Sequence, residues 1–149
     1  MRYLEDIEVG SRTAFGPYQV TREEVIDFAT KFDPQPFHLD DAAAAKTYFG
    51  RLSASGWHTA AMTMRMMVDG WSAGDATASL GSPGVDELRW VKPVYPGDTL
   101  TAEGECIEVT PSRSKPDIGS VKNIITVRNQ HGETVMTMRS IGLVRRRPA

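Results

Sequence analysis

The sequence predicts an α+β fold in which an antiparallel sheet wraps around one long apolar helix. Helical patterns fill the chain up to about Trp71 and strand patterns fill it from about Ala76 onward. Such segregation of helices from strands is typical of α+β proteins. The segment from Gly56 to about Trp71 has almost no polar face, which indicates a helix buried at the centre of the fold.

The composition is that of an ordinary globular protein. The 149 residues suit a single domain spanning 1–149. Lys and Arg number 17 against 19 Asp and Glu, a net charge of −2, so we expect no nucleic-acid partner. No segment has the length and apolarity of a membrane span, and the acidic N-terminus does not fit a signal peptide. The single Cys106 excludes an internal disulfide and favours a cytoplasmic location.

Three helices are expected. Thr21 is predicted to cap the first, with Glu24 reaching back to complete a capping box. Apolar residues at helical spacing continue to Phe32, after which Pro34 and Pro36 stop the helix. The other two are a short helix over Ala42–Tyr48, capped by Asp40 or Asp41, and the long helix from Gly56 to about Trp71.

The second half of the chain predicts the sheet. A change of alternation at Ile107 indicates a bulge, and the residues 129–132 form a credible hairpin turn. A twisted sheet around one apolar helix is called a hot-dog fold. The expected strands are Val85–Val94, Thr99–Val109, Ser120–Asn129 and Glu133–Val144.

The loop after the first helix carries the strongest chemical signal. Asp33 and His38 lie five residues apart between two prolines, and carboxylate and imidazole are the usual general base and acid. Taken alone, such a spacing is more often structural than catalytic. Further along, Ser55 and Gly56 open the apolar helix, where free backbone N–H groups can bind a carbonyl that gains negative charge. A simple turn at Gly56 is the alternative.

These elements, in this order, resemble the MaoC-like dehydratase family, which includes the (R)-specific enoyl-CoA hydratases. The resemblance rests on Asp33 through His38, the alanine-rich stretch Ala42–Ala45, the small residue and glycine at Ser55 and Gly56, and a strand ending with Pro93, Val94, Gly97 and Asp98. It spans nearly the whole chain.

The resemblance implies reversible hydration of a trans-2-enoyl-CoA to an (R)-3-hydroxyacyl-CoA, by a homodimer or a dimer of dimers. Asp33, His38 and Gly56 would be the catalytic positions. No metal and no cofactor is implied, because coenzyme A is part of the acyl-CoA substrate. The sequence departs from the family at Gln35, which replaces the usual Asn, and at Phe37, which replaces an aliphatic residue.

Neighbouring side chains are expected to contact the substrate. We assign this role to Gln35, Phe37, Ser55 and Trp57, with helix capping an equally good role for Ser55. Candidate contacts for the phosphates of coenzyme A are Arg139, Arg145–Arg147, Arg89 and Lys92, although a solvated basic tail explains the C-terminal arginines more simply.

Two other functions remain open. A hot-dog acyl-CoA thioesterase would direct water against the thioester carbonyl and release free thiol. A non-catalytic acyl-CoA-binding subunit would bind without turnover, and Gln35 is the residue that leaves this alternative open.

Overall fold

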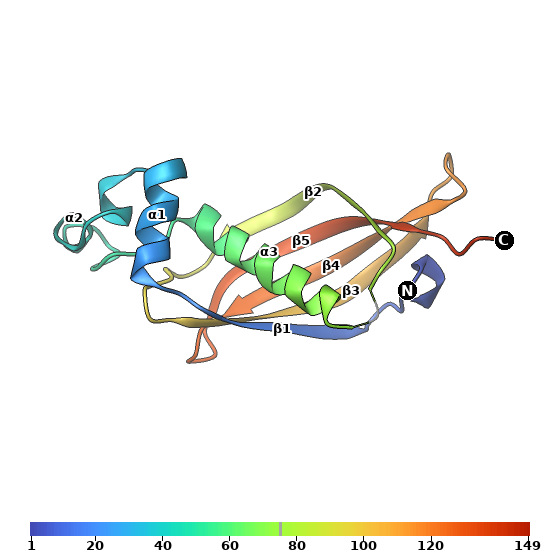
Figure 1. The fold of residues 1–149 in the computed structure, drawn as a ribbon, viewed down its shortest axis with the longest axis horizontal. Coiled ribbons are helices and arrows are strands. Elements are labelled where there is room, and N and C mark those ends of the chain that lie inside the picture. The colour runs from blue at the N-terminus through green and yellow to red at the C-terminus, as the bar shows by residue number, and fades with distance from the viewer. Residues whose placement is uncertain (75) are drawn as a thin grey trace.

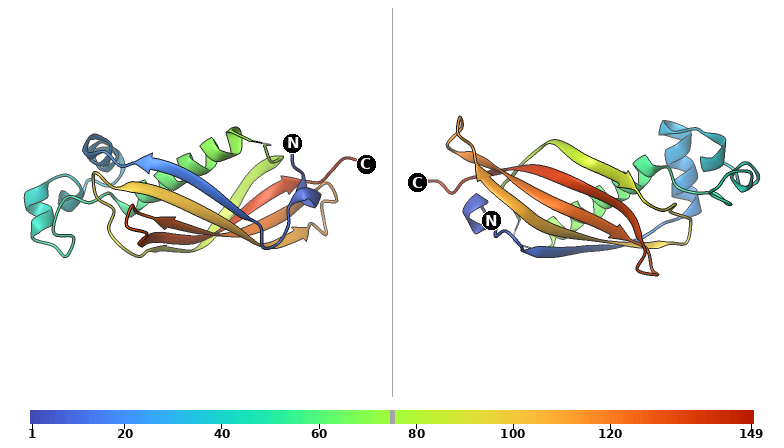
Figure 2. Two further views of the ribbon diagram at one scale, coloured as in Figure 1. Left: turned by 90° about the horizontal axis from the view of Figure 1, so that it is seen from below. Right: turned by 180° about the vertical axis from the view of Figure 1, so that it is seen from behind.

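The predicted sheet around a central helix is confirmed in a computed structural model that describes residues 1–74 and 76–149 (Figure 1). Over these residues the antiparallel strands lie in the order β1-β3-β4-β5-β2. Figure 2 shows the sheet curving along the central helix. The strands are β1 (Arg12–Gln19), β2 (Ser79–Trp90), β3 (Thr99–Pro111), β4 (Ile118–Arg128) and β5 (Thr134–Arg145).

The helices begin within one residue of where the sequence predicts. They are α1 (Arg22–Phe32), α2 (Asp41–Ala45) and α3 (Gly56–Ser72), with 3₁₀ turns at Leu4–Asp6 and Pro36–His38. Thr21 caps α1 by accepting a hydrogen bond from the Glu24 N–H. The predicted return bond from Glu24 is wrong, because that carboxylate accepts a hydrogen bond from the Tyr18 hydroxyl instead.

The second helix is shorter than predicted. Asp40 caps it through the Ala43 N–H, but the helix ends at Ala45 rather than Tyr48. Thr47 donates its hydroxyl to the Ala44 carbonyl, and such local side-chain bonds compete with helical continuation. The chain then leaves through a short loop toward α3.

The central helix is buried on one side only. Met62, Met66 and Met67 belong to the core that the helix forms with the sheet, and His58, Thr59 and Thr63 are buried as well. The ring of His58 stacks on Phe28 of α1. The opposite face exposes an apolar stripe at helical spacing, formed by Trp57, Met64, Val68 and Trp71 with exposed fractions of 60%, 45%, 41% and 39%. The prediction of burial all round is therefore wrong for this face of a single chain.

Strand β1 corrects the prediction that the first half is mainly helical. It pairs antiparallel with β3 at the edge of the sheet. Gly16 and Pro17 interrupt it, and the pairing shifts register between Phe15 and Tyr18. Only Phe15 within the strand is buried, so the alternation that marks a half-buried strand is missing.

Strand β2 is displaced from its predicted bounds of Val85–Val94. It starts at Ser79 and ends at Trp90, because the following segment forms a turn. Within this turn the buried Asp98 accepts a hydrogen bond from the Tyr95 N–H. The other three strands match their predicted positions to within two residues, and the predicted bulge is confirmed by a register shift between Cys106 and Glu108.

The packed core lies between α3 and the concave face of the sheet. Its buried apolar side chains come from every strand except β2, and include Phe15, Leu100, Ile125, Val127, Val135 and Met136. Figure 1 shows α1 and α2 at one end of the molecule and both chain termini at the other. Within the described residues, no helix has the combination of length and apolarity that crossing a bilayer needs.

Candidate active site

The loop after α1 brings Asp33 and His38 together, as the sequence predicts. Asp33 closes α1 with its N–H bonded to the Ala29 carbonyl. Pro36 then opens the 3₁₀ turn that ends at His38. As a result, His38 Nε2 lies 3.5 Å from Asp33 Oδ2, with the imidazole almost fully buried and the carboxylate largely so.

Two side chains hold the Asp33 carboxylate. Ser55 donates its hydroxyl to Oδ2 at 2.7 Å, and Gln35 donates its amide Nε2 to Oδ1 at 2.7 Å. Burial raises the pKa of Asp33, but the bonds from Ser55 and Gln35 and the nearby His38 outweigh it, so the pKa lies below its usual value. Asp33 is therefore ionised and oriented at neutral pH. Gln35, which replaces the usual Asn of the family, therefore holds the carboxylate in place. The Ser55 side chain contacts Asp33 and does not cap α3.

The imidazole of His38 is fixed by a backbone group. Its Nδ1 lies 2.7 Å from the Ser53 carbonyl oxygen, which can only accept, so Nδ1 carries a proton. In the neutral ring, Nε2 then has the lone pair, and Nε2 is the atom that faces Asp33. Phe37 meets the imidazole edge-on at 4.6 Å between ring centroids and stacks on Phe49 at 5.3 Å. Phe37 thus packs against the imidazole ring.

Gly56 is the first residue of α3, directly after the Ser55 that holds Asp33. Among residues 1–74 and 76–149, its N–H has no hydrogen-bond acceptor. A Cβ at this position would lie 2.4 Å from the indole of Trp90, so glycine is required by the approach of that ring. Trp90 also meets Trp57 edge-on at 5.0 Å.

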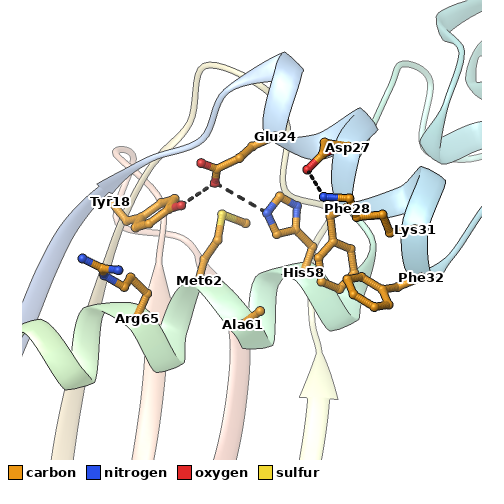
Figure 3. A pocket seen from close by; sticks show the side chains of 10 residues that line it. All are labelled: Tyr18, Glu24, Asp27, Phe28, Lys31, Phe32, His58, Ala61, Met62 and Arg65. Atoms are coloured by element: carbon orange, nitrogen blue, oxygen red, sulfur yellow. Dashed lines mark hydrogen bonds and ion pairs between the residues drawn. The ribbon is translucent and has the colours of Figure 1, made fainter.

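A cavity of about 260 Å³ lies between α1 and α3 (Figure 3). Phe32, which precedes Asp33, and His58, one turn beyond Ser55, are among its lining residues. Phe28 stacks on His58 at 4.7 Å, with the rings nearly parallel. Apolar and polar side chains share the lining, which consists of Tyr18, Glu24, Asp27, Phe28, Lys31, Phe32, His58, Ala61, Met62 and Arg65.

The polar side of this cavity is centred on Glu24. The carboxylate accepts a hydrogen bond from Tyr18 and lies 3.8 Å from His58 Nε2 (Figure 3). Burial and the bond to Glu24 raise the pKa of Tyr18 to about 12. Burial lowers the pKa of His58, although Glu24 opposes this effect. His58 thus faces Glu24, and no metal-binding group of three or more His, Cys, Asp or Glu side chains occurs within the described part of the chain.

The C-terminal arginines lie away from the site. Arg146 pairs with Glu5 at 2.9 Å, and Arg147 donates to Asp6. These pairs are at the end of the molecule opposite α1 and α2 (Figure 1). They neutralise two of the C-terminal cations that the sequence offered for phosphate binding.

Two groups at the site, the Ser53 carbonyl and the Trp90 indole, carry no signal of their role in the sequence. The Ser53 carbonyl carries no sequence signal, because every residue has one. Trp90 was recognised only as a strand residue, and nothing in its neighbours indicates contact with Gly56. A side chain that packs on a distant glycine becomes visible only when the strands are placed.

A model of the MaoC like domain matches residues 8–129. The chain belongs to this family. The MaoC-like dehydratase of Rhodospirillum rubrum is 42% identical in a structure that covers all of both chains, with a TM-score of 0.91. The 3-hydroxybutyryl-CoA dehydratase of Methylorubrum extorquens is 30% identical over 115 residues, which are 76% of this chain and 69% of that protein. An (R)-hydratase from A. caviae is 26% identical, with a TM-score of 0.68 over 97% of this chain and 99% of its own.

The comparisons confirm the family and the hot-dog fold. Hydratase and dehydratase names recur among these MaoC-like relatives. The matched residues 8–129 of this chain include the loop with Asp33 and His38 and the start of α3. The family match therefore covers the whole candidate site.

Proposed function

We propose that this MaoC-like protein hydrates a trans-2-enoyl-CoA reversibly to an (R)-3-hydroxyacyl-CoA. The observation that carries the proposal is the Asp33 carboxylate oxygen 3.5 Å from His38 Nε2, held by Ser55, whose chain neighbour Gly56 has a free N–H. The dehydratase and hydratase names of its relatives support the same reaction class. No cofactor is needed beyond the coenzyme A that the substrate carries.

One water molecule can hydrogen-bond to both Asp33 and His38, because the two acceptor atoms are close enough for it to bridge them. His38 Nε2 takes a proton from this water while its oxygen bonds to the β-carbon. The π electrons move toward the thioester oxygen, which then carries enolate charge. His38 finally returns the proton to the α-carbon on the same face, so the elements of water are added across the double bond.

Asp33 and Gly56 stabilise the charges that develop. The Asp33 carboxylate orients the water and stabilises the imidazolium of His38. The Gly56 N–H binds the thioester oxygen more strongly as it becomes enolate-like, and such selective strengthening accelerates a reaction. General acid–base help is worth about 10²–10⁴ in rate, and one oxyanion donor about 10²–10³.

We assign the acyl group to the cavity between α1 and α3. A thioester oxygen at Gly56 places the acyl chain near the first turns of α3, where His58 and Met62 line the cavity. The volume of about 260 Å³ is below the usual range of roughly 300–1,000 Å³ for small-molecule pockets. A short acyl group therefore fits this site best.

The exposed stripe of α3 supports a homodimer. Trp57, Met64, Val68 and Trp71 are exposed apolar residues at helical spacing, which a second copy would remove from water. Trp57 follows Gly56 directly, so the site would lie at the edge of this interface. The composition, with one buried free cysteine, favours the cytoplasm.

Enoyl-thioester absorbance tests the reaction. A series of trans-2-enoyl-CoA substrates of increasing length is incubated with the protein, and free thiol is measured in parallel. Loss of absorbance without thiol, greatest for short chains and yielding the (R) product, supports hydration. Release of thiol would assign a thioesterase instead, and binding without either signal would assign a non-catalytic subunit.

A further inference from the structure

An aromatic column runs from His38 to the protein surface. Phe37 contacts the imidazole and stacks on Phe49, which in turn stacks on Tyr48 at 4.3 Å between centroids. Tyr48 ends the column with 86% of its surface exposed. An exposed ring held by a stacked neighbour is a preformed platform for another flat group, because its orientation is already fixed.

Two cations, Lys46 and Arg51, lie within three residues of Tyr48 in the segment between α2 and α3. Within the part of the chain that the structure describes, neither Lys46 nor Arg51 forms an ion pair with an acidic side chain. Arg51 lies over the Tyr95 ring, with Cζ 3.9 Å from the centroid. Tyr95 in turn donates its hydroxyl to the Phe49 carbonyl. The guanidinium is therefore attached to the same loop while its N–H groups stay available.

Several other exposed cations are neutralised by acidic side chains. Lys92 pairs with Glu133, Arg139 with Glu87 at 3.2 Å, and Arg146 with Glu5 at 2.9 Å. Positive charge without a partner thus adjoins an exposed aromatic face beside the candidate site. This combination matches a ligand that has both a flat base and phosphates, since aromatic side chains stack on any base and Arg binds phosphate through its fork of donors.

We propose that the loop over residues 46–51 binds the nucleotide end of coenzyme A. The adenine stacks on Tyr48, and Lys46 and Arg51 bind the phosphates. The pantetheine arm then follows the column past Phe49 to a thioester at His38 and Gly56. This inference rests on the proposed function for the identity of the thioester, but binding of the nucleotide can be measured without any turnover.

Calorimetric titration with adenosine 3′,5′-bisphosphate tests the site directly. The wild-type protein is expected to bind it, and Tyr48→Ala is expected to weaken binding about fivefold or more, the usual effect of losing one base-stacking ring. Arg51→Gln and Lys46→Gln should each weaken binding as well. Arg113→Gln is the matched control, because Arg113 is exposed in the β3–β4 loop and has no acidic partner among the described residues.

Hydration kinetics with two thioesters give a second test of the nucleotide site. The three loop variants should lower kcat/KM for trans-2-butenoyl-CoA and leave it unchanged for trans-2-butenoyl-pantetheine, which lacks the nucleotide. Equal losses on both substrates, or no loss on either, would overturn the inference. If the wild type hydrates neither thioester, the proposed function fails and the titration alone decides. Absence of bisphosphate binding, or binding that Tyr48→Ala leaves unchanged, then overturns the nucleotide site.

Discussion

The substitution Gly56→Ala places a methyl group against the indole of Trp90. The new Cβ would lie 2.4, 2.5 and 2.9 Å from Cδ2, Cε2 and Cγ, which are atoms at the centre of the indole. The whole ring must therefore move. Overpacking of this kind costs about 1–3 kcal/mol. The lower entropy of the unfolded alanine chain offsets about 0.4–1 kcal/mol.

The middle of these two ranges gives a net loss of about 1–2 kcal/mol in the free energy of unfolding. At the size of this chain that lowers Tm by roughly 2–8 °C. The shift of the first turn of α3 also moves the N–H of residue 56. If that group binds the thioester oxygen, kcat for enoyl-CoA hydration should decrease by about 10²–10³.

Thermal unfolding followed by circular dichroism and hydration followed by ultraviolet absorbance measure the two effects. Gly84→Ala is the matched control, because a Cβ there meets no atom within 4 Å. In the background of Trp90→Leu, the thermal cost of Gly56→Ala should largely disappear, which isolates the contact between the two residues. A Gly56→Ala variant with wild-type Tm and turnover would refute both the steric argument and the role of the N–H.

The remaining predictions concern other side chains. Asp33→Asn should fold and lose at least about 10² in kcat, whereas Ser55→Ala, which leaves the carboxylate present but less well held, should lose less. Ser55→Ala should also raise the pKa of Asp33, which NMR titration of its carboxyl carbon measures. The free energy of unfolding should be highest above the ordinary histidine pKa of about 6.5 and should decrease as the pH falls below it. The reason is that burial lowers the pKa of His58 in the folded protein, so only the unfolded chain takes up a proton in this range. Urea unfolding of His58→Leu should show a weaker dependence on pH. Val68→Glu should give a monomer by light scattering, since it places a charge in the exposed α3 stripe.

Each of these predictions has an outcome that contradicts it. Near-normal turnover of Asp33→Asn would remove Asp33 from the mechanism. An unchanged carboxyl titration of Asp33 in Ser55→Ala would show that the hydroxyl does not depress the pKa of Asp33. The same pH dependence in His58→Leu would assign the effect to other groups, and a wild type that is already monomeric would exclude the proposed dimer.

The sequence predicted the parts of the fold that local signals determine. The Thr21 cap and the prolines after Phe32 are short-range features, and they located both ends of α1. Strand β1 escaped detection because its pairing partners lie in β3 and its own alternation is interrupted at Gly16 and Pro17. Non-local pairing of this kind leaves little trace in the strand itself.

The candidate site divides in the same way. The residue types Asp33, His38 and Gly56 were found from their order along the chain, and the structure brings Asp33 and His38 together. The geometry of their support was not predictable. Whether the longer amide of Gln35 reaches Asp33 depends on the path of the loop, and the contact between Gly56 and Trp90 depends on how β2 passes α3.

The bond that orients His38 has a consequence for how this protein can tolerate mutation. Ser53 contributes its main-chain oxygen to the imidazole, while its own hydroxyl is fully buried and has no hydrogen-bond partner among the described residues. The segment is anchored by the Ala54 N–H on the Val94 carbonyl at 2.8 Å. The tautomer of the histidine is thus protected from changes of side chain at position 53. An alanine there would remove an unsatisfied hydroxyl and leave the oriented imidazole intact, so selection for stability can act on this residue independently of selection for chemistry.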